Sequence, residues 1–164
     1  MSNTERPRVW VVIANVTPTT LYTMVGLRGP TIKNAGCWNF FGGNVDDGEN
    51  PKDAACRELF EETGMQVDPE ALVMLFQEQV QTKKGKCKPC TWFVVPAAAV
   101  DHSCRRFTTE TVEYDWIDHT WEAEDNLHYS VRYFIAWWRM KQEQYAPNTD
   151  LKDITHLKQL GILT

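Results

Sequence analysis

The chain has 164 residues, enough for one domain with a hydrophobic core but too few for two domains of ordinary size. Hydrophobic residues make up 43% and charged residues 24%, which excludes a disordered, collagen-like or coiled-coil protein. With 17 basic and 22 acidic side chains the formal net charge is -5, which argues against binding of nucleic-acid polymers through their phosphates.

The sequence also argues against a membrane or secreted protein. The longest uncharged stretch, residues 9–27, is broken by a polar turn and falls short of the roughly 20 apolar residues of a membrane-spanning helix. Residues 1–8 lack the apolar core of a signal peptide, and five irregularly spaced cysteines are not a disulfide framework. We expect a cytoplasmic protein with one domain over residues 1–164, its core at about 8–143 and a C-terminal tail at 144–164.

Runs rich in β-branched and aromatic residues, bounded by turn signals, predict the strands of this domain. The first two runs flank a Thr-Pro-Thr turn and indicate a hairpin. Residues 42–48 are dense in Gly, Asp and Asn and indicate a loop, and the Lys-rich residues 83–88 indicate another. The predicted strands are Arg8–Val16, Leu21–Leu27, Trp38–Phe41, Leu72–Gln81, Thr91–Val95 and Val112–Ile117.

Capping signals delimit one helix. Asn50 is a good N-cap, Pro51 suits the first helical position, and Asp53 places negative charge in the first turn. Gly64 can adopt the left-handed conformation that ends helices. We therefore expect a helix over Pro51–Thr63.

A second helix follows from apolar residues that recur every three or four positions between Leu127 and about Gln142. Similar spacing after Asp150 indicates a short helix in the tail. Strands and helices without regular alternation favour an α/β protein of the α+β type, in which helices pack against a mixed sheet.

The first helix carries an acidic stripe. At about 100° per residue, Glu58, Glu61 and Glu62 fall within one third of the circumference. Like charges at this spacing destabilise an isolated helix, so the stripe needs a cation. Carboxylate oxygens suit Mg²⁺, which commonly binds substrate phosphates in its remaining positions. Arg57 can orient Glu61 through a forked ion pair. The alternative is a solvated acidic helix face.

The residues around the stripe favour the metal site. At every fixed position the segment Gly43–Met65 is similar to the 23-residue Nudix box, and the chain is identified as a member of the Nudix family. The resemblance implies a mixed sheet sandwiched between helices. It also implies metal-dependent cleavage of a pyrophosphate bond in a nucleoside diphosphate linked to another moiety. The matching positions are Gly43, Glu49, Arg57-Glu58, Glu61-Glu62, Gly64 and the apolar Met65.

The resemblance assigns the metal ligands. Glu58 and Glu62 become the principal ligands, with Glu61 and the Gly43 carbonyl as further ones. Glu49 would support the loop and the helix. The expected cofactor is Mg²⁺, with Mn²⁺ as a substitute, and the expected nucleophile is a metal-activated water.

The catalytic residues implied by the resemblance are Glu58, Glu61 and Arg57. Our first choice for the general base is Glu58, although a carboxylate from a later loop can serve in this family. Glu110 and Glu113 are the additional candidates, and each is about as well explained as an ordinary surface residue.

Four residues are candidates for substrate binding. Trp38, Phe41 and Trp116 can stack on a base or simply fill the core, and Arg28 can reach a phosphate or end a strand in solvent. Phe41 stands where the family usually has Pro, which suggests an adjusted pocket. The Pro typical of ADP-ribose hydrolases and the Tyr typical of dinucleoside polyphosphate hydrolases are absent around residues 80–83. Nucleoside triphosphates or other nucleoside diphosphate derivatives therefore come first.

Three alternatives remain open. The domain could bind a nucleotide or a partner without catalysis, although its complete set of carboxylates favours an enzyme. The aromatic helix around Tyr133, Trp137 and Trp138 could form a homodimer. Cys87 and Cys90 could form half of a zinc site, but no second pair stands at ligand spacing.

Overall fold

The computed structural model describes residues 4–17, 20–118 and 126–145. The predicted tail helix after Asp150 lies outside this part of the chain. Within the described part, no helix is long and apolar enough to span a membrane.

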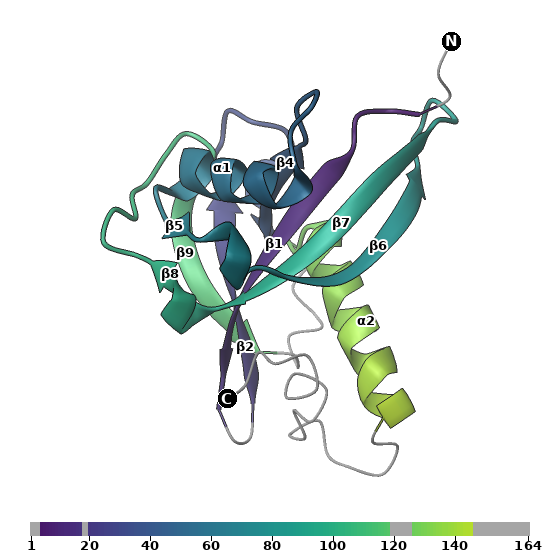
Figure 1. Ribbon diagram of the computed structural model, residues 1–164. Helices are drawn as coiled ribbons and strands as arrows, with labels where there is room; N and C mark the ends of the chain where they lie inside the picture. The colour runs from purple at the N-terminus through teal and green to yellow at the C-terminus, as the bar shows by residue number, and fades with distance from the viewer. Residues whose placement is uncertain (1–3, 18–19, 119–125, 146–164) are drawn as a thin grey trace.

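A mixed sheet with two longer helices forms the domain, as the sequence predicted (Figure 1). The sheet has seven strands, with the order β3-β2-β1-β7-β6, while β4 also pairs with β1 and β9 with β2. Among the strands of the described residues, β1 and β7 are the one pair that runs parallel, and a second small sheet joins β5 to β8. The elements in chain order are β1 (Arg8–Val16), β2 (Leu21–Arg28), β3 (Trp38–Asn39), β4 (Phe41–Asn44), α1 (Pro51–Thr63), β5 (Gln66–Val67), η1 (Pro69–Ala71), β6 (Val73–Gln81), β7 (Cys87–Pro96), η2 (Ala97–Ala99), β8 (Val100–Asp101), β9 (Thr111–Asp118) and α2 (Tyr129–Tyr145).

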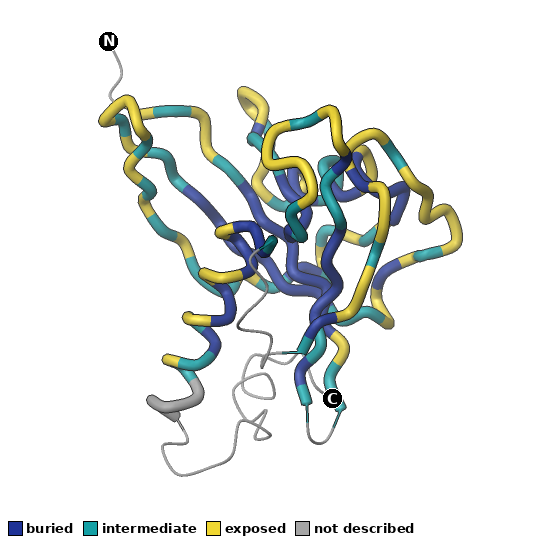
Figure 2. Tube along the Cα trace, turned by 180° about the vertical axis from the view of Figure 1, so that it is seen from behind, coloured by how far each residue is buried: buried dark blue, intermediate teal, exposed yellow. Residues whose placement is uncertain are grey.

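The alternation of side chains along β1 divides the core into two layers. Val9, Val11 and Ile13 pack on one side with apolar residues of α1. Trp10 and Val12 pack on the other side with apolar residues of α2. The helices therefore cover opposite faces of the sheet, and Figure 2 shows buried residues concentrated in the strands between them.

The predicted loop over residues 42–48 begins later than expected, because its first three residues belong to a strand. Residues 41–44 form β4, which pairs with β1 from Val11↔Phe41 to Arg8↔Asn44. Gly42 permits this close pairing, because a Cβ atom there would collide with the carbonyl oxygen of Val9. The segment that resembles the Nudix box therefore begins in β4, and hydrogen bonds to β1 hold the backbone of its first residues in the main sheet.

The Lys-rich loop is also shorter than predicted, because β7 begins at Cys87 and includes Lys88. Cys87 is exposed and Cys90 is buried. Residues three apart in a strand point to opposite faces, so these two thiols do not form a shared pair of zinc ligands. None of the five cysteines is in a disulfide.

His128 caps the start of α2 from a buried position. Its Nδ1 accepts a hydrogen bond from the Ser130 amide at 3.2 Å and lies 2.9 Å from Ser130 Oγ. Burial lowers the pKa of His128 to about 4, and the positive charges of Arg28, Arg8 and Lys33 act in the same direction. The folded protein thus favours the neutral imidazole.

This burial predicts a loss of stability in mild acid. Because the pKa is about 6.5 unfolded and about 4 folded, the unfolded chain binds the proton first, and stability falls as pH drops through this window. We expect His128 to account for up to about 3 kcal/mol of that loss. Urea unfolding at pH 7 and 4.5 would measure it against His128→Asn, which keeps a capping group but does not titrate. An equal loss in both proteins would contradict the prediction.

Candidate active site

Local signals set the ends of α1, and both predicted ends are confirmed. The Asn50 side chain accepts a hydrogen bond from the Lys52 amide at 2.9 Å. Gly64 is left-handed, with φ 76°, and its amide donates to the Phe60 carbonyl at 2.7 Å. Burial of Ala55 and Leu59 against the sheet fixes the rotation of the helix. The acidic stripe consequently lies along β4 and the loop that follows it.

Arg57 is the centre of the hydrogen-bond network at this edge. Its Nε and Nη2 donate to the two carboxylate oxygens of Glu49 at 2.9 and 3.0 Å, which is a forked pair. Its Nη1 donates to Glu58 at 3.0 Å and to Glu61 at 3.3 Å, and Nη2 also reaches the Asn44 carbonyl at 2.9 Å. Arg57 thus joins β4, the loop and the helix. The sequence predicted only one of these contacts, the one between Arg57 and Glu61.

Glu49 makes hydrogen bonds both within the loop and to the helix. Besides Arg57, its carboxylate accepts a hydrogen bond from the Asp46 amide at 2.9 Å. The hydrogen bond from Arg57 is the largest influence on this group and lowers the pKa of Glu49. Glu49 therefore stays ionised and keeps Arg57 aimed at the stripe.

Glu58 lies directly against Gly43. A Cβ atom at residue 43 would overlap the Glu58 carboxylate, so only glycine leaves room for it. Burial raises the pKa of Glu58, the hydrogen bond from Arg57 opposes this, and the charges of Glu61 and Glu110 raise it further. A carboxylate thus sits beside the Gly43 backbone in a half-buried position.

Glu62 is the most deeply buried carboxylate of the stripe, with 5% of the residue exposed. One oxygen accepts a hydrogen bond from the Gly42 amide at 3.1 Å. Burial raises the pKa of Glu62 to about 8, against the lowering effect of the Gly42 hydrogen bond, and the negative charges of Glu110 and Glu58 add to the rise. Such a group is stabilised in its ionised form by a nearby cation.

The stripe residues differ in environment although they share one side of the helix. Glu61 is exposed, Glu58 is half-buried and Glu62 is buried. Within the described residues, no three acidic, His or Cys side chains converge as a preformed metal cluster. The donor set nevertheless fits Mg²⁺: carboxylate oxygens beside a glycine backbone, one of them buried and short of positive charge.

The segment before β9 brings one of the two additional carboxylates to the site. Thr108 Oγ1 donates to the Glu62 carbonyl at 2.9 Å, and the Arg106 amide donates to the Thr63 carbonyl at 2.9 Å. Glu110, in the same segment, raises the pKa of both Glu58 and Glu62 through its charge. Glu113 instead lies exposed on β9, opposite Leu27 of β2.

The four candidate substrate-binding residues do not form one surface. Phe41 is fully buried in the α1-side core and lies 6.1 Å from the Tyr114 ring, which leaves it no access to a ligand. Trp38 is partly buried and packs on the α2-side core. Trp116, on β9, is 37% exposed, and Arg28 donates from Nε to the Lys33 carbonyl at 2.7 Å.

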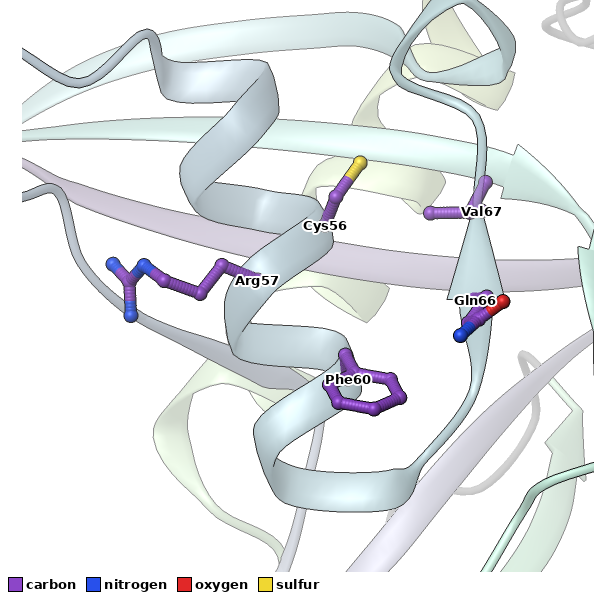
Figure 3. A pocket seen from close by; sticks show the side chains of 5 residues that line it. All are labelled: Cys56, Arg57, Phe60, Gln66 and Val67. Carbon is purple, nitrogen blue, oxygen red and sulfur yellow. The ribbon is translucent and has the colours of Figure 1, made fainter.

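A shallow cavity of ≈ 340 Å³ lies on another side of α1, against β5. Figure 3 shows Cys56 and Phe60 facing Gln66 and Val67 across it, while Arg57 extends away. The three glutamates of the stripe do not line it. We therefore place the chemistry at β4 and the acidic side of α1, not in this cavity.

Sequence reasoning missed the contributions of Gly42, Asn44 and Asp46. Gly42 donates to Glu62, Asn44 offers its carbonyl to Arg57, and Asp46 Oδ2 lies 3.6 Å from Arg57 Nη2. The paired glycines before the box were a signal for Gly42. The other two contacts carry no local signal, because they depend on how the loop folds back over the helix.

A mixed sheet between two helices, with a glycine strand and an arginine-held glutamate stripe, defines the Nudix class of domains. The family model described as "NUDIX domain" matches residues 5–138, so the chain belongs to this family. A MutT NUDIX hydrolase from Burkholderia pseudomallei shows the same fold, with TM-score 0.60 and 22% identity, over 80% of this chain and 98% of that one.

Two curated relatives match short segments. An oxidized purine nucleoside triphosphate hydrolase of Mus musculus is 59% identical over 34 residues, 21% of this chain. An RNA pyrophosphohydrolase of Bartonella quintana (strain Toulouse) is 61% identical over 28 residues, 17% of this chain. These matches span only 22% and 16% of the relatives' own lengths.

Proposed function

We propose that this protein is a Mg²⁺-dependent pyrophosphohydrolase that cleaves a pyrophosphate bond in a nucleoside triphosphate or a related nucleoside diphosphate derivative. The observation that carries the proposal is the pair of glutamates held at the glycine strand. Glu62 is buried on the Gly42 amide, and Glu58 fills the space beside Gly43. Holding both negatively charged carboxylates partly or fully out of water costs free energy, and a bound divalent cation would offset that cost.

Each residue of the site has a part in this proposal. Glu58, Glu62, Glu61 and the Gly43 carbonyl would hold the metal, with Mn²⁺ as a substitute. When bound, Mg²⁺ supplies neutralisation of phosphate charge and a more acidic water. Arg57 orients Glu58 and Glu61 through its Nη1. This network supports Glu58 as the group that accepts the proton of the attacking water, while Glu110 is the next candidate.

In this reaction one P–O bond of the P–O–P bridge breaks and the water oxygen binds the released phosphorus. The bridging oxygen leaves with the other phosphate. The substrate class rests on the short matches to relatives named as nucleotide and RNA pyrophosphate hydrolases. We also infer a cytoplasmic location, since Cys87 and Cys104 are exposed and carry no disulfide.

The homodimer expected through α2 is not part of the proposal. Trp138 is fully buried in its own subunit, and Trp137 packs on the same core. Tyr133 keeps 42% of its surface exposed but stacks on Trp92, with ring centroids 5.7 Å apart. Most of the apolar surface that suggested a dimer is therefore used within one chain.

A phosphate-release screen tests the proposed function. Purified protein with Mg²⁺ would be offered nucleoside triphosphates, dinucleoside polyphosphates, ADP-ribose, NADH and nucleotide sugars, each with an EDTA control. We expect Mg²⁺-dependent turnover of at least one. Nucleotide binding without turnover of any would favour the alternative, a Nudix-like domain that binds a nucleotide or a partner without catalysis.

Thermal unfolding with Mg²⁺ gives an independent prediction. Because the pKa of Glu62 is raised to about 8, the metal-free protein carries a proton on Glu62 at pH 6, and Mg²⁺ must displace that proton to bind. At pH 8.5 a smaller fraction of the protein carries this proton. At a hundred times the dissociation constant we expect the Tm to rise by roughly 5 °C or more. The rise should be larger at pH 8.5 than at pH 6. A rise that is the same at both values would contradict a site built on Glu62.

A further inference from the structure

Arg8 lies at the start of β1, next to the proposed metal site but on the other face of the sheet. Its register partners are Asn44 in β4 and Cys90 in β7. Two-residue periodicity puts Arg8 on the side of Trp10, and its guanidinium carbon lies 4.3 Å from the centroid of that ring. The guanidinium of Arg8 is thus held by stacking on Trp10, on the strand that pairs with β4.

Lys88 reaches the same place from β7. Its Nζ donates to Asn44 Oδ1 at 3.0 Å. Burial lowers the pKa of Lys88, and the positive charge of Arg8 is the next influence in the same direction. Lys88 therefore binds the side chain of Asn44, the residue that follows Gly43, and Arg8 is the register partner of Asn44 in β1.

These cations lack a counter-charge in the described part of the chain. Neither has a carboxylate oxygen within 4.0 Å. The Nε of Arg8 is buried without a hydrogen-bond acceptor. Glu5 acts on Lys88 only through its more distant charge, and Glu78 accepts a hydrogen bond from Trp92 at 3.2 Å. A bound anion would stabilise both positive charges and give the buried Nε of Arg8 an acceptor.

The cation pair and the glutamate pair share one strand. Gly43 faces Glu58, and the next residue, Asn44, accepts a hydrogen bond from Lys88. The charge of Arg8 also lowers the pKa of Glu62, so the two groups interact electrostatically around the edge of β4. A phosphate chain that crosses this edge would meet the glutamate site with one phosphate and the cations with another.

We propose that Arg8 and Lys88 form an anion subsite for a substrate phosphate beyond the pyrophosphate whose bond is cleaved. The guanidinium fork and the ammonium group both suit phosphate oxygens. The subsite would favour chains of three or more phosphates over diphosphate-linked substrates such as nucleotide sugars. This inference rests on the proposed function for its place in the reaction, but the binding step can be measured separately.

The test uses inorganic tripolyphosphate and inorganic pyrophosphate as probes, titrated calorimetrically into the full chain in EDTA. Arg8→Met keeps an apolar stem over Trp10 and removes the charge, and Lys88→Met does the same on β7. Arg105→Met is the matched control, because Arg105 also lies over an aromatic ring, at 4.9 Å from the Tyr114 centroid. Arg8→Lys tests rescue by charge alone. Thermal melting of each variant checks the fold.

We expect the wild type to bind tripolyphosphate about tenfold more tightly than pyrophosphate. Arg8→Met and Lys88→Met should each weaken tripolyphosphate binding by about tenfold, Arg8→Lys by less, and Arg105→Met by less than about twofold. Unchanged binding in both Met variants would overturn the subsite. So would an equal loss in Arg105→Met, since that indicates general attraction by charge.

A second measurement links the subsite to turnover. In the Mg²⁺ assay, Arg8→Met should raise KM for a nucleoside triphosphate about tenfold with kcat nearly unchanged, and change KM for a nucleotide sugar little. Equal KM changes for both substrates would overturn the preference for longer phosphate chains. If no substrate turned over while tripolyphosphate still bound through Arg8 and Lys88, the proposed hydrolysis would fail and the anion subsite would stand.

Discussion

The variant Glu62→Gln should lose Mg²⁺-dependent turnover by roughly 10²–10³-fold and still fold. Glutamine keeps the side-chain length and an oxygen that accepts the 3.1 Å hydrogen bond from the Gly42 amide. It removes the negative charge that the proposed metal requires. Steady-state kcat with the best substrate of the screen measures the effect, and Glu70→Gln, an exposed carboxylate on η1, is the matched control.

The same variant should make the metal-free protein more stable. With a pKa of about 4.5 unfolded and about 8 folded, Glu62 binds its proton more tightly in the folded state. Stability is therefore lost as pH rises through this range, and at pH 8.5 the wild type bears the cost of a buried charge. We expect Glu62→Gln to unfold at higher urea than the wild type at pH 8.5 in EDTA, and to gain nothing from Mg²⁺. Near-normal turnover of Glu62→Gln would refute the role of this carboxylate.

Gly43→Ala should produce the second large loss. A Cβ atom at residue 43 occupies the position of the Glu58 carboxylate, so Glu58 must leave its place beside the β4 backbone. Because Arg57 also binds Glu58 and Glu61, the displacement should spread to the rest of the stripe. We expect kcat/KM to fall by about a hundredfold. The apparent dissociation constant for Mg²⁺, measured from the Tm rise, should increase in parallel.

Gly36→Ala separates this effect from a general loss of stability. Gly36 has φ 75° and no atoms within 4 Å of an added Cβ, so alanine there costs about 1 kcal/mol of backbone strain and displaces no side chain. Its kcat/KM should match the wild type. If Gly43→Ala retained activity, or if Gly36→Ala lost as much, Glu58 would not need its place beside Gly43.

Arg57 has a broader role in the structure than orienting one carboxylate. It binds Glu49 in the loop, Glu58 and Glu61 on the helix, and the carbonyl of Asn44 on the strand. These contacts place two of the stripe glutamates before any cation is bound. Preorganisation of this kind lowers the cost of assembling a metal site.

Much of α1 could be predicted because its signals are local. Asn50 caps the helix through an amide two residues away, and Gly64 ends it through a carbonyl four residues back. The helical period alone brings Glu58, Glu61 and Glu62 to one side. The resemblance of residues 43–65 to the Nudix box uses the same short range of the chain, and the family match confirms it.

The aromatic residues could not be assigned in the same way. Phe41 and Trp38 are both aromatic residues of predicted strand segments, yet Phe41 is fully buried beneath α1 and Trp38 is partly buried on the α2 side. Alternation along a strand shows which side chains share a face, but the exposure of that face depends on the element that packs on it. Only the packing of both helices settles this for each ring.

The sequence by itself determined the limits of the helix, the spacing of its glutamates and the family of the domain, because each depends on residues close together along the chain. The tertiary structure decided which glutamate is buried. It also placed Gly42 against Glu62, 20 residues away, and Lys88 against Asn44, 44 residues away. These contacts exist because β1 pairs with both β4 and β7, and long-range strand pairing follows from burial of the whole sheet, which no local pattern encodes. The net charge of -5 is thus unevenly distributed: the glutamate stripe lies on one side of β4, and on the other side lie Arg8 and Lys88, which have no carboxylate partner among the described residues.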